Sequence, residues 1–343
     1  MPSFSRASKR ERAATLPEVL VAVAILFVVM VSILQYCTLV ERAWKSASVD
    51  PFAEAGNAFE TVTRNLASAT LEPYQDYADA NGSFRTNSIV APNPPFLPDH
   101  LARRSDLDFV CGPTLGTNGL LAASNRITMG SAVFFLAPAG FTQTYANTGM
   151  DRLLNAMGYF VEFGADVPSL GFLQLQSNAW RWRLKQVMQP AESLQIFATS
   201  DSSDWIQQIV PAGATLPILA DDVIALVILP EQVVNHATTP LTGAFGYDSR
   251  DTSNKLTLHQ LPPILRVVLV AIDEASAQRL AAQNGTNPPQ LVPGNLFQIA
   301  TQQQLDADLA TLDNALTAQK IGHRIFQREI LLPSANWSNT ASQ

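Results

Sequence analysis

One uncharged run near the amino terminus constrains this chain more than any other feature. Residues 19–40 are 22 consecutive residues without an acidic or basic side chain. A helix of that length spans about 33 Å at a rise of about 1.5 Å per residue, which is enough to cross the hydrocarbon core of a bilayer. The run therefore predicts a long N-terminal transmembrane helix.

The charges on either side of this run predict its orientation. Arg6, Lys9, Arg10 and Arg12 precede it, and Glu41 is the first acidic residue after it. Because basic residues stay on the cytoplasmic side, we expect a single-pass protein of the inner (cytoplasmic) membrane, with the N-terminus cytoplasmic and the body in the periplasm or outside. The net charge of −7 argues against a nucleic-acid partner.

A helical pattern continues beyond the uncharged run. Apolar residues recur at steps of three and four between Phe52 and Ala69. Pro51 interrupts the backbone hydrogen-bond ladder, and Asp50 is placed to cap a second helical segment. We therefore expect a leader over residues 1–13 and a helix over residues 14–70 that is kinked at Pro51.

A short motif lies where the uncharged run begins. Residues 13–22 read Ala-Ala-Thr-Leu-Pro-Glu-Val-Leu-Val-Ala. This resembles the class III signal of type IV pilins and pseudopilins, in which cleavage precedes a Thr-Leu-x-Glu-x-Leu apolar helix. The resemblance implies that a prepilin peptidase cuts between Ala13 and Ala14 and methylates the new amino group of Ala14. Ala13 stands where glycine is usual, and Ala14 where phenylalanine or methionine is usual, so an uncleaved anchor is the alternative.

Glu18 is the one charged residue in this motif. A carboxylate at the edge of a membrane helix is costly and usually has a partner or a function. In the pilin family the equivalent glutamate meets the amino terminus of a neighbouring subunit during assembly, so the resemblance implies an assembly role for Glu18. The alternative is an interfacial carboxylate that the helix dipole stabilises.

The rest of the chain, residues 71–343, predicts a sheet with added helices. Turn signals dominate residues 70–130, and short apolar runs bounded by Gly, Pro, Asn and Asp predict strands over residues 132–136, 158–163, 180–188, 223–229, 265–272 and 325–332. Alanine- and leucine-rich segments predict helices over residues 274–283 and 302–320, which form a helical insertion over about 274–320. The predicted fold class is α+β, with the transmembrane helix leading into a mainly antiparallel β-sheet body.

The carboxyl half carries a second resemblance. Leu-Pro-Pro-Ile-Leu-Arg-Val over residues 261–267 and Arg-Glu-Ile-Leu-Leu-Pro over residues 328–333 resemble strands of J-type minor pseudopilins of type II secretion. With the leader and the ending Leu-Pro-Ser-Ala-Asn-Trp, the chain is most similar to the Verru/Chthon cassette protein C family, a pilin-like group. The resemblance implies a pilin-like body and a minor pseudopilin-like subunit of a type II secretion or type IV pilus-like assembly. Its implied partners are a prepilin peptidase, other pilin-like subunits, an assembly platform with its ATPase, and membrane lipid.

The sequence offers little support for an enzyme. The four histidines, His100, His236, His259 and His323, are widely separated, and no HExxH, GxGxxG, P-loop or G-x-S-x-G motif occurs. We therefore expect no catalytic residues, no cofactor and no metal site. The alternative function is an uncleaved, single-pass anchored extracytoplasmic binding or adhesion module, and an anchored hydrolase is a third possibility.

Two further clusters have competing interpretations. Asp221 and Asp222 precede an apolar run, which fits either a calcium-binding loop or, as we favour, a solvated turn. Trp180-Arg181-Trp182-Arg183 contains the aromatic and basic residues of a nucleic-acid contact, but alternation along a strand places the tryptophans on one face and the arginines on the other. We expect a half-buried strand.

Overall fold

The computed structural model describes residues 16–46, 50–84, 96–114, 119–165, 180–197, 205–243 and 245–338. The chain divides into two compact units, residues Met1–Pro51 and Phe52–Gln343. Ala13 and Ala14, the residues of the predicted cleavage site, lie outside the described part of the chain.

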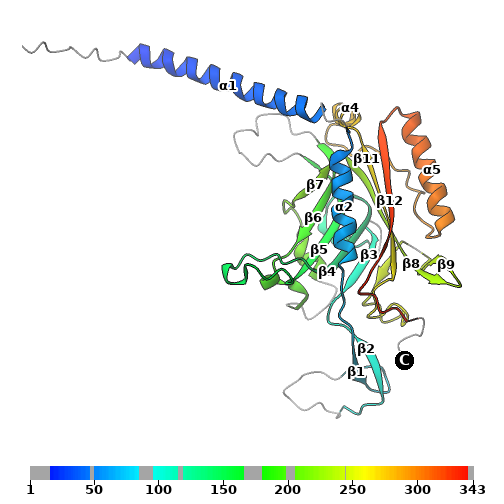
Figure 1. Cartoon of the computed structure of the whole chain (residues 1–343). Coiled ribbons are helices and arrows are strands. Elements are labelled where there is room, and N and C mark those ends of the chain that lie inside the picture. The colour runs from blue at the N-terminus through cyan, green and yellow to red at the C-terminus, as the bar shows by residue number, and fades with distance from the viewer. Residues whose placement is uncertain are drawn as a thin grey trace, which may run out of the picture. The chain divides into compact units, whose positions relative to one another are not determined.

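The first unit contains helix α1 (Leu16–Ser46) (Figure 1). Its described apolar side chains between Leu20 and Tyr36 are largely exposed. Side-chain hydroxyls of Ser32 and Thr38 donate hydrogen bonds to the carbonyl oxygens of Val28 and Gln35, at 2.8 Å each. These bonds satisfy polar groups within the helix itself. Among the described residues of this unit, none packs over these apolar side chains.

The predicted fold class is wrong. The structure is mostly β-sheet with a few helices, and within the described ranges no helix combines the length and the apolar character that crossing a membrane requires. The prediction gave one uncharged run more weight than the many short strands that follow it.

Two helices are described within the expected helical segment 14–70, and residues 47–49 between them lie outside the described residues. Helix α1 ends at Ser46, and α2 (Ala53–Ala67) begins two residues after Pro51, which lies in a turn. Proline lacks a backbone N–H and restricts the preceding residue, which fits a helical segment that begins just after Pro51. Phe52, rather than Asp50, is the N-cap residue of α2, and its side chain makes no capping hydrogen bond.

The second unit is built on antiparallel sheets (Figure 1). One sheet contains, in spatial order, β10 (Tyr247–Asp248), β3 (Phe109–Pro113), β4 (Thr128–Pro138), β5 (Leu154–Ala165), β6 (Trp180–Met188) and β7 (Ile218–Asp221). A second contains β12 (His323–Leu331), β11 (Ile264–Ile272), β8 (Val223–Val234) and β9 (Ala237–Pro240). Strands β1 (Tyr74–Ala78) and β2 (His100–Arg104) pair with each other in a separate hairpin.

Helices and short turns complete this unit. The further α-helices are α3 (Trp205–Ile209), α4 (Glu274–Asn284) and α5 (Gln302–Ala318), and 3-10 turns occur at Ala122–Ser124, Tyr145–Asn147, Ala191–Ser193 and Gln195–Phe197. The predicted runs at 132–136, 158–163, 180–188 and 223–229 lie in β4, β5, β6 and β8, and those at 265–272 and 325–332 lie in or overlap β11 and β12. The two predicted helices correspond to α4 and α5. These individual predictions are confirmed.

The core lies where the two main sheets meet. Strand β8 contacts β4, β5 and β6 of the other sheet, and all nine residues of β11 are buried. Helix α2 lies across strand β12, with Phe59 5.7 Å from Phe326 between ring centroids. Burying a side chain the size of Phe59, Val62 or Leu66 contributes about 1.5 to 3 kcal/mol each, which is what holds α2 on the sheet.

Candidate functional site

The predicted processing and assembly residues lie at the start of the chain. Glu18 lies in the first turn of α1, and Ala13 and Ala14 precede the described residues. Cleavage, methylation and the assembly role of Glu18 therefore stay predictions. Two features of the second unit are candidates for a functional site. One is a cluster of charged side chains, and the other is a cleft.

The charged cluster lies where the chain passes from one sheet to the other. Strand β6 supplies Arg181 and Arg183, strand β7 ends at Asp221, Asp222 follows, and Glu274 begins helix α4. We call these five residues the junction cluster. Three segments that are distant in sequence therefore meet at one point.

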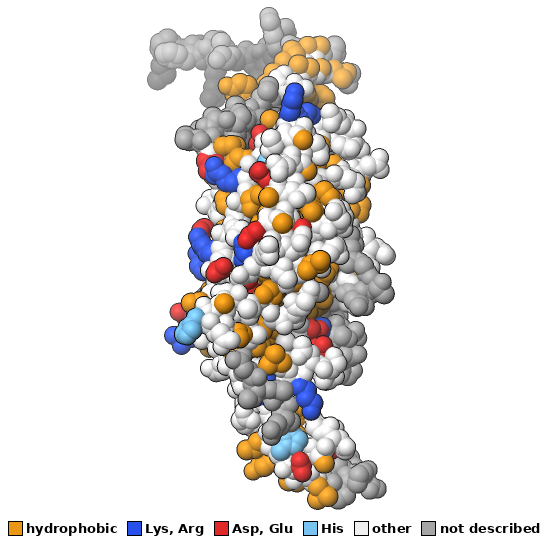
Figure 2. Space-filling model, turned by 90° about the vertical axis from the view of Figure 1, so that its right-hand side faces the viewer, with side chains coloured by type: hydrophobic (Ala, Val, Ile, Leu, Met, Phe, Trp, Pro, Cys, Tyr) orange, Lys and Arg blue, Asp and Glu red, His pale blue; other side chains and the backbone are white. Residues whose placement is uncertain are grey.

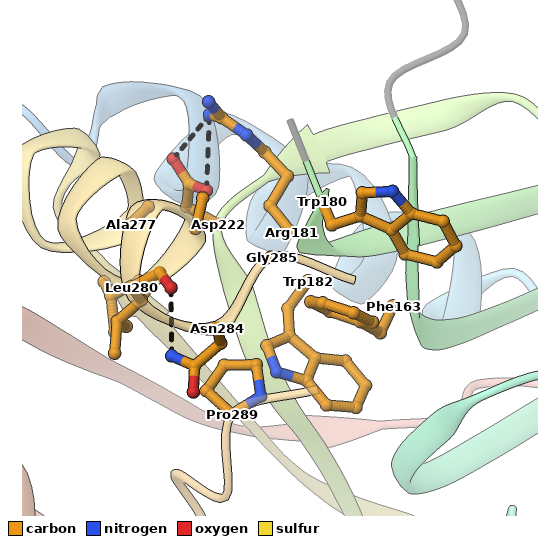
Figure 3. A pocket seen from close by; sticks show the side chains of 12 residues that line it. Phe163, Trp180, Arg181, Trp182, Asp222, Ala277, Leu280, Asn284, Gly285 and Pro289 are labelled. Atoms are coloured by element: carbon orange, nitrogen blue, oxygen red, sulfur yellow. Dashed lines mark hydrogen bonds and ion pairs between the residues drawn. The ribbon is translucent and has the colours of Figure 1, made fainter. Parts of the chain in front are cut away.

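Two arginines neutralise the carboxylates of the junction cluster. Arg181 Nη1 lies 3.3 Å from Asp222 Oδ2 and 2.9 Å from Glu274 Oε2, and Figure 3 shows the bonds to Asp222. Arg183 Nε donates to Asp221 Oδ1 at 2.7 Å, and its Nη1 donates to the Gly164 carbonyl at 2.7 Å. Only 1% of the Arg183 side chain is exposed, so its charge depends on these partners.

Asp222 is also the corner of the backbone between the sheets. Its N–H donates to the Trp182 carbonyl of β6 at 2.9 Å, and its own carbonyl accepts from the Ile272 N–H of β11 at 2.9 Å. Its φ of 60° lies in the left-handed region, which Asp and Asn tolerate better than most residues. One residue thus hydrogen-bonds both sheets through its main chain and Arg181 through its side chain.

The pKa values of the two carboxyl groups beside Arg181 are shifted in opposite directions. Burial raises the pKa of Asp222 to about 8; the charge of Arg181 opposes this rise, and the nearby Glu274 adds to it. Burial also acts to raise the pKa of Glu274, but hydrogen bonds with Arg181 and Asp222 outweigh it and lower that pKa. Of these two carboxyl groups, Asp222 is therefore the one that keeps its proton to the higher pH.

We expect Asp222→Asn to change the pH dependence of folding. The raised pKa of Asp222 means that the folded state keeps a proton that the unfolded state has lost, so its contribution to stability falls as pH rises from about 4 to about 8. Asparagine cannot lose that proton. Relative to wild type, Asp222→Asn should gain on the order of 4 kcal/mol in the free energy of unfolding between pH 5 and pH 9. Urea denaturation at both pH values measures this difference.

The neighbouring Asp221→Asn is the matched control for this measurement. It makes the same chemical change one residue away and removes the partner of Arg183 rather than that of Arg181. Its stability should still fall as pH rises, as that of wild type does, because Asp222 keeps its carboxyl group. Parallel wild-type and Asp222→Asn profiles would contradict the assignment of the proton to Asp222.

The junction cluster is built to hold the structure together rather than to hold a ligand. The space beside it is ≈10 Å³, about what one water molecule needs. A calcium ion at Asp221 and Asp222 would have to compete with two arginines that already lie against those carboxylates. The solvated turn that we favoured is wrong as well, because Asp222 is buried. Elsewhere in the described ranges no group of three or more His, Cys, Asp or Glu side chains is arranged to hold a metal.

Strand β6 is more deeply buried than its sequence suggests. Trp180 and Trp182 both contact Phe163, with ring centroids 5.7 and 5.2 Å away, as alternation predicts (Figure 3). The arginine face was expected to be exposed, but Arg183 is buried and Arg181 is nearly so. The sequence contains the acidic partners of these arginines, Asp221 and Asp222. The pairing could not be inferred from the sequence because the order of the strands in the sheet was not known.

A cleft of ≈590 Å³ lies on the other side of Trp182. Its walls come from β3, from the start of β4, from β8 and from residues 288–298. Gly130 in β4 has a φ of 73°, and a Cβ added there would lie 2.5 Å from the Leu226 carbonyl oxygen. The two sheets therefore touch at Gly130, where β4 is irregular, and separate beside it.

The histidines lie in separate surroundings. His100 contacts Asp99 at 3.0 Å and His323 contacts Asp313 at 2.8 Å. Burial, and then the charge of Arg103, lower the pKa of His259 to about 4, so this imidazole is neutral at pH 7. None of these contacts forms a nucleophile and base arrangement.

Charge on the visible face of the second unit is mixed. Among the described side chains in Figure 2, Lys and Arg lie interspersed with Asp and Glu, and hydrophobic side chains lie between them. A nucleic-acid surface gathers basic side chains into a continuous patch, which this face does not present. Comparison of the chain with models of protein families, with curated proteins and with solved structures finds no match.

Proposed function

We propose that this protein is a minor subunit of a pilin-like envelope assembly of the pseudopilin kind, in which α1 packs against the equivalent helices of neighbouring subunits. A prepilin peptidase would cut between Ala13 and Ala14, and an assembly platform with its ATPase would supply the driving force. The class III motif at residues 13–22 supports the processing step.

The exposed apolar surface of α1 is the observation that carries this proposal. Ile25, Leu26, Phe27 and Val28 are all exposed, with 68% exposure at Phe27. Successive residues of a helix point about 100° apart, so four exposed neighbours surround the helix with apolar surface. Soluble surfaces rarely carry so large an apolar patch without a partner to cover it. Other apolar helices of the same kind are the partners that match it in length and chemistry.

The second unit supports a minor rather than a repeating position. Helix α2 lies against an antiparallel sheet through one apolar stripe, which is the arrangement that the pilin resemblance implies. Residues 71–343 form a body with two main sheets, an extra hairpin and the α4 and α5 helices. So bulky a body would crowd a tight helical array, which favours a tip or priming position.

Native Cys37 tests the proposal by cross-linking. It is exposed on α1, whereas Cys111 is buried and burial raises the pKa of its thiol, so one reactive thiol dominates. A short bismaleimide applied to intact cells should join mature chains through Cys37 to pilin-like partners that carry a cysteine at a similar position, or to a second copy. Cys37→Ser should remove these products.

The pattern of products separates the competing functions. Products of one chain with smaller subunits support the minor position, and a long ladder of this chain alone would contradict it. Absence of any Cys37-dependent product would favour the binding or adhesion module.

A further inference from the structure

The cleft beside Trp182 has the size and the lining of a small-molecule site. Its volume of ≈590 Å³ lies within the range of about 300 to 1,000 Å³ that ligand pockets occupy. Met129, Val227, Phe245 and Leu296 give it apolar walls. The described lining contains no Asp, Glu, Lys or Arg. Such a lining suits an uncharged ligand, because a charged one would lose its hydration without gaining a partner.

Two buried polar atoms in the wall are without partners. Trp182 Nε1 and Thr128 Oγ1 make no hydrogen bond within the described part of the protein, and the two residues are 3% and 2% exposed. Trp182 lines the cleft, and Figure 3 shows its indole beside Pro289, which lies between Pro288 and Gln290 of the cleft wall. A buried donor without an acceptor is costly, so two such atoms in the wall of one cleft favour a ligand there.

We propose that the cleft binds an uncharged, mainly apolar small molecule with a carbonyl or hydroxyl oxygen that accepts a hydrogen bond from Trp182 Nε1. The Thr128 hydroxyl provides a second polar contact. The apolar body of the ligand lies between β4, β8 and residues 288–298. This site belongs to the second unit alone and goes beyond the assembly role proposed for α1.

Prodan, an uncharged fluorescent naphthalene ketone, is the probe for this site. Added to the full-length protein, it should bind saturably with a blue shift in its emission. Val292 is half-buried in the cleft wall, and Val292→Trp should weaken binding at least tenfold by filling the space. Val233→Trp makes the same change at an exposed position of β8 outside the cleft and should leave the affinity unchanged. Unchanged binding by Val292→Trp would overturn the proposal, because the probe would then lie elsewhere, for example on α1.

Variants of the two polar residues test how the ligand is recognised. Trp182→Phe keeps an aromatic ring against Phe163 and removes the N–H, and Thr128→Val keeps the shape and removes the hydroxyl. Each should weaken prodan binding by about three- to tenfold, the value of one hydrogen bond. An analogue with a propyl group in place of the propionyl group lacks the acceptor, and neither variant should change its affinity. Equal losses for both probes would show that these residues only shape the wall and would overturn the assigned hydrogen bond. Thr128→Val keeps the test valid if Trp182→Phe does not fold.

Discussion

Glu18→Ala is expected to abolish incorporation of this chain into its assembly while the total amount of the chain in the cell stays at the wild-type level. In the proposed assembly, Glu18 pairs with the amino terminus of a neighbouring subunit in apolar surroundings. Removing one member of such a pair leaves the other charge buried and unpaired, at a cost of about 3 to 5 kcal/mol. That cost corresponds to a loss of at least about a hundredfold in incorporation. The yield of Cys37-dependent cross-linked product, divided by total chain, measures it.

Glu41→Ala is the matched control for this experiment. It removes the first acidic residue after the uncharged run, and incorporation should stay at the wild-type level. Glu18→Gln should behave as Glu18→Ala does, because the amide keeps the shape but not the charge. Normal incorporation of Glu18→Ala would contradict the assembly role of this residue and favour the binding or adhesion module.

Arg181→Met is expected to destabilise the second unit by about 3 to 5 kcal/mol. The substitution keeps the apolar part of the side chain and removes the cation that lies against Asp222 and Glu274. Arg181 and Asp222 are nearly buried, so water cannot replace the lost charge. Urea denaturation of the full-length protein, followed by tryptophan fluorescence, measures the loss.

Two comparisons show whether the loss comes from the uncompensated carboxylates. Arg328→Met removes a guanidinium whose ion pair with Glu60 is exposed, and its effect should be much smaller because water screens that pair. At pH 9, adding Asp222→Asn to Arg181→Met removes the cost of burying or protonating the Asp222 carboxylate and should recover part of the lost stability. If the double variant is no more stable than Arg181→Met alone, the pairing at the junction is not what holds the sheets together.

Patterns within one element predicted much of the second unit. Strands β8 and β11 stand out as continuous apolar runs, as expected for strands that are buried on both faces. Helix α5 begins after Thr301, whose hydroxyl accepts from the Gln304 N–H at 3.1 Å, and α4 begins after Asp273, which accepts from the Ser276 N–H at 2.7 Å. These caps are local signals, so the sequence carries them in full.

Features that depend on contacts between distant segments could not be predicted. The partners of Arg181 lie 41 and 93 residues away along the chain, and no short pattern connects them. The cleft exists because β4 departs from regular pairing near Gly130 and residues 288–298 lie across the opening. The fold class failed for a different reason, because one uncharged run was given more weight than the many short strands that follow it.

Intact mass and N-terminal sequencing of the protein recovered from its native cells would test the central claim most directly. The pseudopilin account predicts a mature chain that begins at Ala14 with an N-methylated amino group. A chain that retains residues 1–13 would contradict prepilin-type processing and, with it, the assembly that this processing prepares.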